Sequence, residues 1–119
     1  MYHVIINPVS RSVRGLHIWN TEIKPILQSR NIPHHAWFSQ QAGDTVRIAK
    51  QITSGTDQPL SLIILGGDGT VNEVLQGLKQ PERITLGYIP TGSSNDLARD
   101  LKLPKNPSDA LSIILDSGT

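Results

Sequence analysis

The sequence predicts an α/β fold, a three-layer open parallel sheet with helices on both faces. Short apolar segments alternate along the chain with segments of helical periodicity, which is typical of strand-helix-strand units. The apolar run from Leu60 to Leu65 is nearly continuous, as expected for a parallel strand that is covered on both faces. Three of the apolar segments are each followed directly by a turn that contains glycine or proline. The expected order of elements is β-α-β-α-β-α-β-α-α, with right-handed crossovers.

The first strand is expected at Val4 to Ile6, because Asn7-Pro8 closes the apolar run and proline cannot donate to a ladder. A helix should follow, since apolar residues recur at spacings of three and four at Leu16, Trp19, Ile23, Ile26 and Leu27. Pro25 would lie inside a helix that begins near Leu16, so a kink is predicted there. A start near Thr21 would instead place Pro25 in the first turns, where proline is better tolerated.

The second strand is expected at His34 to Phe38, where aromatic and small residues lie between Pro33 and a polar segment. Gly43-Asp44 should open the next helix, and Ser54-Gly55 should end it. This helix has a partly apolar face, formed by Val46, Ile48, Ala49 and Ile52.

The third strand, Leu60 to Leu65, leads directly into Gly66-Gly67-Asp68-Gly69-Thr70 and a further helix. A capping box is predicted to start that helix: the Thr70 hydroxyl can accept from the Glu73 amide, while the Glu73 side chain reaches back to the Thr70 amide. Ile84 to Ile89 should form the fourth strand.

Two more helices are expected after the fourth strand. Asn95 or Asp96 can cap a short helix that follows Pro90-Thr91-Gly92. Asn106-Pro107 is typical of another helix start, with asparagine as the cap and proline at the first helical position. Gly118 is expected to close this last helix.

Size, charge and cysteine content restrict the class of protein. The chain has 119 residues, of which 37% are apolar, and this predicts one globular domain. Eleven basic and ten acidic residues are interspersed, so the net charge of +1 gives no general attraction to nucleic acid or an anionic membrane. The chain has no cysteine, which excludes disulfides and thiolate sites and favours a cytoplasmic location. No apolar run approaches the ~20 residues that span a bilayer.

The turns that follow the strands form the candidate site. Because the strand ends of a parallel sheet share one edge, these turns should meet in a crevice. In the second turn, the glycines permit positive φ and let a phosphate approach the amides, and the helix N-terminus that follows attracts anions. Asp68 would repel such an anion unless a divalent cation lies between them, which points to Mg²⁺ and a nucleoside triphosphate. The three turns are Asn7-Pro8-Val9-Ser10, Gly66-Gly67-Asp68-Gly69-Thr70 and Pro90-Thr91-Gly92-Ser93-Ser94-Asn95-Asp96.

A glycine-rich turn between a strand and a helix can also be purely structural, and this alternative applies to Gly66 to Thr70 when that turn is taken alone. The turn matches neither the Gly-x-x-x-x-Gly-Lys phosphate loop nor the Gly-x-Gly-x-x-Gly dinucleotide fingerprint, so the enzyme classes that use those loops are disfavoured.

Longer segments resemble the signatures of a known family. Gly66 to Val74, Gly-Gly-Asp-Gly-Thr-Val-Asn-Glu-Val, resembles the signature of the diacylglycerol kinase catalytic domain, which bacterial lipid kinases, sphingosine kinases and ceramide kinases share. Pro90 to Arg99 is similar to the family's second signature, Pro-x-Gly-Thr-x-Asn-Asp-x-Ala-Arg, and Asn7-Pro8-Val9-Ser10 matches most of its opening Asn-Pro-x-Ser-Gly turn. The resemblance covers essentially all 119 residues and implies an N-terminal domain of the NAD kinase/diacylglycerol kinase-like fold.

The resemblance implies phosphoryl transfer from ATP, with Mg²⁺, to the hydroxyl of a diacylglycerol-like lipid. It implies that Asp68 is the catalytic carboxylate and one part of the metal site. Asn72 and Glu73 would support the second turn, and Asn95 and Asp96 would brace the third. The residues that would bind the nucleotide are Asn7, Ser10, Arg11, Ser39, Gly66, Gly67, Asp68, Gly69, Thr70, Asn72, Glu73, Gly92 and Ser93.

The sequence departs from the family pattern in three places. Arg11 stands where the family has glycine, so the first turn bends differently or the guanidinium adds a phosphate contact. Ser93 replaces a threonine and keeps its hydroxyl. Family members continue into a second, β-rich domain with lipid contacts, further acidic residues and the general base, and nothing after Thr119 supplies it. We therefore expect an ATP-binding domain that is inactive alone, in a parent enzyme that works peripherally at the inner face of the membrane.

Other conspicuous residues are expected to be structural. His34 and His35 are neighbours in a strand and should point to opposite faces, so they do not make a metal pair. Trp19 and Trp37 are expected in the core, and Asp44 at a helix start. A solvated helix end is expected for three basic residues, with contact to lipid headgroups as the alternative: Arg99, Lys102 and Lys105.

Two other functions remain as alternatives. An NAD kinase-like enzyme shares the fold and the Gly-Gly-Asp-Gly turn, although the match through Asn72-Glu73 and the second signature favour the lipid kinase family. The second alternative is a non-catalytic nucleotide-binding or regulatory module.

Overall fold

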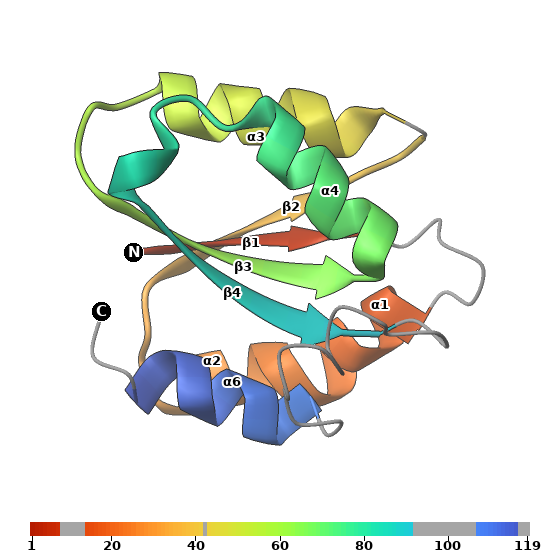
Figure 1. Ribbon diagram of the computed structural model, residues 1–119. Helices are drawn as coiled ribbons and strands as arrows, with labels where there is room; N and C mark the ends of the chain where they lie inside the picture. Colours follow the sequence, from red (N-terminus) through yellow and green to blue (C-terminus); the bar gives the residue numbers. More distant parts are fainter. Residues whose placement is uncertain (8–13, 42, 92–106, 117–119) are drawn as a thin grey trace.

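The computed structural model describes residues 1–7, 14–41, 43–91 and 107–116. Within these ranges, β1 (Tyr2–Ile6), β2 (His34–Phe38), β3 (Leu60–Gly66) and β4 (Ile84–Pro90) form one sheet in the order β2-β1-β3-β4. All three strand pairs are parallel. Helices lie above and below this sheet (Figure 1), so the predicted three-layer α/β fold is confirmed.

The two central strands supply side chains to both helical layers, because successive residues of a strand point to opposite faces. In β1, Val4 and Ile6 enter one core and Ile5 enters the other. β3 is divided in the same way, with Ile63 and Leu65 on one face and Leu62 and Ile64 on the other. The nearly unbroken apolar run of β3 is therefore the consequence of burial on both faces.

The helices divide between the two faces of the sheet (Figure 1). On one face lie α3 (Asp44–Ser54) and α4 (Asp68–Gly77), which bury Ile48, Ala49, Ile52, Val71 and Val74. On the other face lie α1 (Arg14–Ile18), η1 (Trp19–Ile23), α2 (Lys24–Ser29) and α6 (Pro107–Asp116). From β1 the chain first moves outward to β2 and then returns past β1 to β3, so these two connections run in opposite directions across the sheet. Because both crossovers are expected to be right-handed, their helices must lie on opposite faces.

The irregularity expected at Pro25 takes the form of a π-helical turn. The helical run begins at Arg14 rather than near Leu16 and ends at Ser29. Its middle segment, Trp19–Ile23, is a π-helix in which the Lys24 amide donates to the Trp19 carbonyl, five residues back. Pro25 then lies in the first turn of α2, directly after the π-helical turn, so the irregularity precedes the proline.

Most other boundaries agree with the sequence. α3 and β2 have the predicted ends, and α6 begins at Pro107 as expected. The 3₁₀ turn η2 (Pro81–Arg83) was not predicted. The short helix predicted after Asn95 or Asp96, and Gly118, lie outside the described residues. None of the helices in the described ranges has the length and apolar character needed to cross a bilayer.

Candidate functional site

The described parts of the three turns meet at the carboxyl edge of the sheet. The Asn7 amide, after β1, donates to the Leu65 carbonyl at 3.3 Å, and the Thr91 amide, after β4, donates to the Gly66 carbonyl at 2.9 Å. The chain leaves β1 toward β2 on one side and reaches β3 on the other, so the direction of winding reverses between β1 and β3. Open parallel sheets bind ligands at such a switch point.

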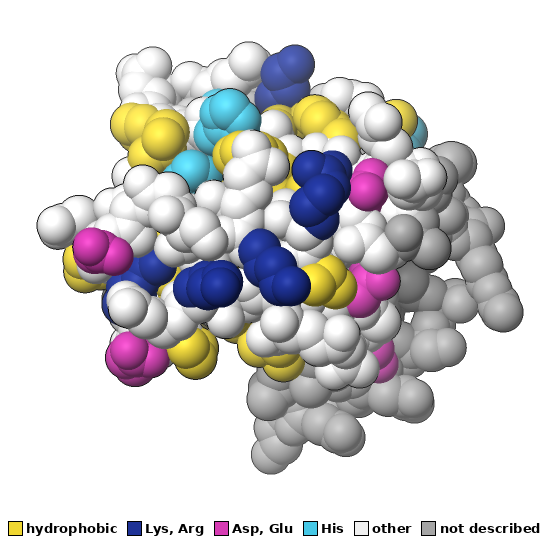
Figure 2. All heavy atoms as spheres, turned by 90° about the horizontal axis from the view of Figure 1, so that it is seen from above, with side chains coloured by type: hydrophobic (Ala, Val, Ile, Leu, Met, Phe, Trp, Pro, Cys, Tyr) yellow, Lys and Arg dark blue, Asp and Glu magenta, His cyan; other side chains and the backbone are white. Residues whose placement is uncertain are grey.

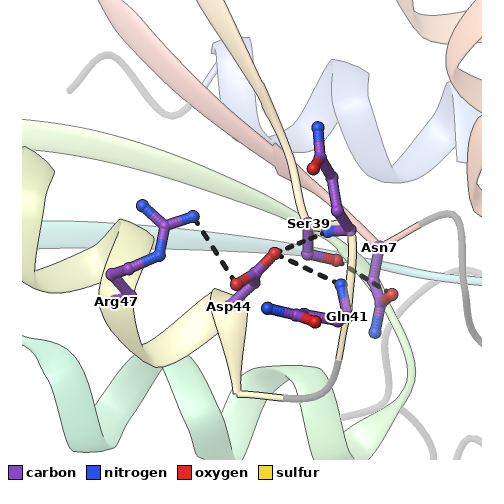
Figure 3. Close-up of polar contacts among 6 residues, drawn as sticks. Asn7, Ser39, Gln41, Asp44 and Arg47 are labelled. Atoms are coloured by element: carbon purple, nitrogen blue, oxygen red, sulfur yellow. Dashed lines mark hydrogen bonds and ion pairs between the residues drawn. The ribbon is translucent and has the colours of Figure 1, made fainter.

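Three polar side chains from three different segments are joined at this edge. The Ser39 hydroxyl donates to Asn7 Oδ1 at 3.0 Å (Figure 3), and Asn7 Nδ2 donates to Thr70 Oγ1 at 3.2 Å. Ser39 is 1% exposed and Thr70 is 4% exposed. The Asn7 amide therefore links the segment after β2 with the first turn of α4, and three of the residues expected to bind nucleotide lie together.

The capping box predicted at Thr70 and Glu73 is wrong, because α4 begins at Asp68. Gly67 is the capping residue and has no side chain to offer, while the Thr70 amide donates to the Gly67 carbonyl at 3.1 Å. Both residues of the expected box thus lie inside the helix. A single residue, Gly67, separates strand from helix, and the Thr70 hydroxyl is the acceptor for Asn7 instead.

The glycines of the second turn, Gly66, Gly67 and Gly69, do not adopt the positive φ that the sequence allowed. Among the described glycines only Gly43 has a positive φ, of 87°. Gly66 is required for space, since a Cβ there would lie 2.6 Å from Thr70 Oγ1. Among the described residues, a Cβ at Gly67 or Gly69 would have no neighbouring atom within 4 Å. The packing of the described residues therefore needs the first glycine, whereas the other two add no side chain at the start of α4.

Asp68 is held by a residue that sequence analysis missed. The Tyr88 hydroxyl donates to Asp68 Oδ1 at 3.1 Å. Tyr88 is 9% exposed and belongs to the core between the sheet and α4, with Val71 and Val74. Burial raises the pKa of Tyr88 above its ordinary value, and the hydrogen bond to Asp68 and the negative charge of that carboxylate raise the pKa further. The available signal was a phenol in an apolar strand, because a buried tyrosine hydroxyl usually has a hydrogen-bond partner.

Asp44 is a structural carboxylate at the start of α3, as predicted. Its Oδ2 accepts from the amides of Gln40 at 2.8 Å and Gln41 at 3.2 Å, and Arg47 Nη2 lies 3.5 Å from Oδ1 (Figure 3). The Gln40 hydrogen bond lowers the pKa of Asp44, burial opposes this, and Arg47 and Gln41 lower the pKa further. These contacts fix the loop that follows Ser39.

His34, His35 and the two tryptophans have structural partners. His34 and His35 lie on opposite faces of β2, as expected: His34 packs edge-on against Trp19 at 5.8 Å, and His35 lies 4.5 Å from Trp37 between ring centroids. Trp19 is 3% exposed and lies in the core. Trp37 is half-buried, and its indole donates to His3 Nδ1 at 3.2 Å. In the part of the chain that the structure describes, no group of three or more His, Cys, Asp or Glu residues could hold a metal ion.

The remaining expected site residues are placed only in part. On α4, Asn72 is exposed and Glu73 is half-buried, in the turn after Asp68. Outside the described residues lie Ser10, Arg11, Gly92, Ser93, Asn95, Asp96, Arg99, Lys102 and Lys105.

The face formed by α3 and α4 carries both basic and acidic side chains (Figure 2), so an anion at the carboxyl edge would be attracted by local groups rather than by a uniformly basic surface.

Comparison with known proteins gives one consistent family. The family model described as "Diacylglycerol kinase catalytic domain" matches residues 1–119. A diacylglycerol kinase of Staphylococcus haemolyticus is 48% identical over 120 residues, which cover 98% of this chain and 34% of that protein. A diacylglycerol kinase of Staphylococcus epidermidis is 41% identical over 95 residues, which cover 78% of this chain and 29% of that protein.

The fold is also similar to that of a solved structure. The crystal structure of a diacylglycerol kinase from Bacillus anthracis superposes with a TM-score of 0.77 at 29% sequence identity, over 98% of this chain and 42% of that one. The chain spans about a third of the length of the curated relatives that it matches.

Proposed function

The chain belongs to the diacylglycerol kinase catalytic domain family, and from this membership we propose that it is the ATP-binding N-terminal domain of a lipid kinase. The reaction is transfer of a phosphoryl group from ATP, with Mg²⁺, to the hydroxyl of a diacylglycerol-like lipid. The proposal is carried by the gathering of Asn7, Ser39, Asp68 and Thr70 at the switch point of the sheet.

The start of α4 suits the phosphates of a nucleotide. The N-terminus of an α-helix carries a partial positive charge, and backbone amides at that end can donate to a bound anion. Gly67 and Gly69 place no side chain over this turn, so a phosphate can approach the backbone closely. We assign further contacts to residues of the first and third turns: Asn7, Ser10, Arg11, Gly92 and Ser93.

The chemistry of Asp68 fits a magnesium ion. A carboxylate at the same helix start as a triphosphate repels it, and a divalent cation between them removes the repulsion. Mg²⁺ commonly takes one or two carboxylates and completes its shell with water and substrate phosphates, so one aspartate is a sufficient contribution from this domain. When bound, the ion neutralises charge that develops on the transferring phosphoryl group.

The domain contributes binding and alignment, and the second domain contributes the rest. Phosphoryl transfer depends mainly on positioning and charge stabilisation, so half of a cleft holds ATP without carrying the reaction. We assign the acceptor lipid, the general base and the remaining acidic groups to a second, β-rich domain, in an enzyme that works peripherally at the inner face of the membrane. The domain alone should show no lipid kinase activity.

The proposal is tested by binding of ATP to the purified chain, measured by calorimetry with Mg²⁺ and with EDTA. We expect Mg²⁺ to strengthen binding in the natural sequence and to have no effect in Asp68→Ala. Asp57→Ala is the matched control, because Asp57 is an exposed aspartate between α3 and β3, away from the carboxyl edge. Absence of nucleotide binding would refute the proposal.

The identity of the acceptor is tested in an assay that uses a protein with both this domain and the second domain. A panel of lipids and NAD is incubated with radiolabelled ATP, and Asp68→Ala is run in parallel. Labelling of a lipid that is lost in Asp68→Ala supports the lipid kinase. Labelling of NAD in place of every lipid would reverse the assignment to the NAD kinase-like alternative.

A further inference from the structure

We propose that Tyr88 is a positioning residue, which holds the Asp68 carboxylate in the orientation that the Mg²⁺-nucleotide complex requires. This inference rests on the function proposed above and adds to it a residue from β4. It is carried by the 3.1 Å hydrogen bond from the Tyr88 hydroxyl to Asp68 Oδ1 and by the burial of the tyrosine ring.

The position of the phenol is fixed by the sheet. Tyr88 is paired with Ile64 of β3 in the parallel ladder. Its ring is enclosed between the sheet and α4, where Val71 and Val74 belong to the same core. A buried aromatic side chain has only two side-chain torsions, so a ring held in this way places its hydroxyl at one point. That point is at the first turn of α4, beside Asp68.

The surroundings of Asp68 explain why a partner from another strand is useful. Its sequence neighbours, Gly67 and Gly69, have no side chains and, within the described residues, a Cβ at either would touch nothing within 4 Å. The side chains next to Asp68 in the sequence therefore contribute nothing to its orientation. The hydrogen bond from Tyr88 supplies a restraint from the core side of the helix.

The Tyr88 hydroxyl is the donor in this hydrogen bond, because a carboxylate oxygen accepts. A hydrogen bond to a carboxylate is stronger than one between neutral groups, so it can restrain the orientation of the Asp68 side chain. A phenylalanine at this position would fill the same space and lose only the donor.

The test compares Tyr88→Phe with the natural sequence in ATP binding, with Mg²⁺ and with EDTA. In Mg²⁺ we expect affinity to fall by about tenfold, which corresponds to one hydrogen bond to a charged group. In EDTA we expect no change. Tyr2→Phe is the matched control, because it removes the same hydroxyl from the only other tyrosine of the chain, at the amino end of β1. It should bind like the natural sequence in both conditions.

A double-mutant cycle separates positioning from a general effect on the fold. In the Asp68→Asn background, Tyr88→Phe should cause no further loss of affinity, because the group that it orients no longer binds the ion. An equal loss with and without Mg²⁺, or the same loss in the Asp68→Asn background, would overturn the inference and leave Tyr88 as a core residue.

An NMR measurement tests the role of Tyr88 without substituting it. In Tyr2→Phe, Tyr88 is the single tyrosine, and its ¹³Cζ resonance in labelled protein should shift when Mg²⁺ and ATP are added together. An unchanged resonance under conditions where the ligand binds would overturn the role of Tyr88 alone. Absence of any Mg²⁺-dependent ATP binding by the natural sequence would overturn both the proposed function and this inference.

Discussion

The side-chain amide of Asn7 donates to the hydroxyl of Thr70 at 3.2 Å and so joins two residues that are 63 positions apart in the sequence. Asn7 follows β1 and Thr70 lies in the first turn of α4, and the contact exists because β1 and β3 are neighbours in the sheet. Ser39 donates to the other end of the same amide at 3.0 Å. One asparagine therefore sets the relative position of two turns that we assign to nucleotide binding.

Asn7→Ala should reduce both stability and nucleotide affinity. The substitution removes the acceptor of Ser39 and the donor to Thr70, and loss of a partner at a buried polar group costs about 1 to 3 kcal/mol. Chemical denaturation measures the first effect and calorimetry with Mg²⁺-ATP the second. Asn20→Ala is the control, since Asn20 is exposed in η1. A variant with native stability and affinity would show that this amide link is dispensable.

The glycines of the second turn should separate stability from binding. Gly66→Ala would place a Cβ 2.6 Å from Thr70 Oγ1, and overpacking of this kind typically costs about 1 to 3 kcal/mol. Gly69→Ala adds a Cβ that touches no described residue within 4 Å, and it should be neutral or stabilising, by up to about 1 kcal/mol, because alanine is the better helix former. Thermal unfolding of both variants measures this difference.

The effect of Gly69→Ala on nucleotide affinity should differ from its effect on stability. We expect Gly69→Ala to weaken Mg²⁺-ATP binding although it does not weaken the fold, because the new methyl group lies where the phosphates would approach the backbone. Gly55→Ala, at the end of α3, is a control for the loss of a glycine elsewhere. Unchanged ATP affinity in Gly69→Ala would contradict the placement of the phosphates at the start of α4.

The strands and most helices were predictable because their cause is local. The apolar run of β3 and the spacing of apolar residues in α3 are patterns that burial imposes on neighbouring positions. Local patterns also explain the error at the start of α4. Thr70 and Glu73 satisfy a local capping pattern, but the helix already begins at Asp68, with Gly67 as its cap. The π-helical turn before Pro25 likewise depends on how the whole helical run packs.

The contacts of the site could be anticipated only as a convergence of turns. A parallel sheet brings strand ends to one edge, and this general rule predicted that Asn7 and Thr70 would be close. It did not predict which atoms would bond, since that depends on the register of β1 against β3. Tyr88 was missed because the local signal, a phenol in an apolar strand, does not name its partner, and Asp68 lies 20 positions earlier, at the start of α4.

The raised pKa of Tyr88 predicts an alkaline titration. In Tyr2→Phe, the near-ultraviolet absorbance of tyrosinate should appear well above the ordinary pKa of 10.0. Asp68→Asn should lower the Tyr88 pKa only partly, because burial is the largest cause of the shift and remains. A folded pKa above the unfolded one means that the associated stability is complete below the unfolded pKa and is lost as the pH rises through the folded value. Titration near the ordinary pKa would contradict the buried hydrogen bond.

The lowered pKa of Asp44 predicts a dependence on acid. A carboxyl whose folded pKa is below its unfolded value, here near 3.8, stabilises the fold above that value, and the stability is lost as the pH falls through the folded pKa. Asp44→Asn should therefore lower stability at neutral pH and flatten its decline on acidification, which urea unfolding at a series of pH values measures. Asp57→Asn, at an exposed position, should leave the curve unchanged. Asp44 Oδ2 accepts from the amides of Gln40 and Gln41, directly after Ser39, so Asp44→Asn should also weaken ATP binding. A loss of acid dependence without any loss of ATP affinity would show that this loop does not contribute to the nucleotide site.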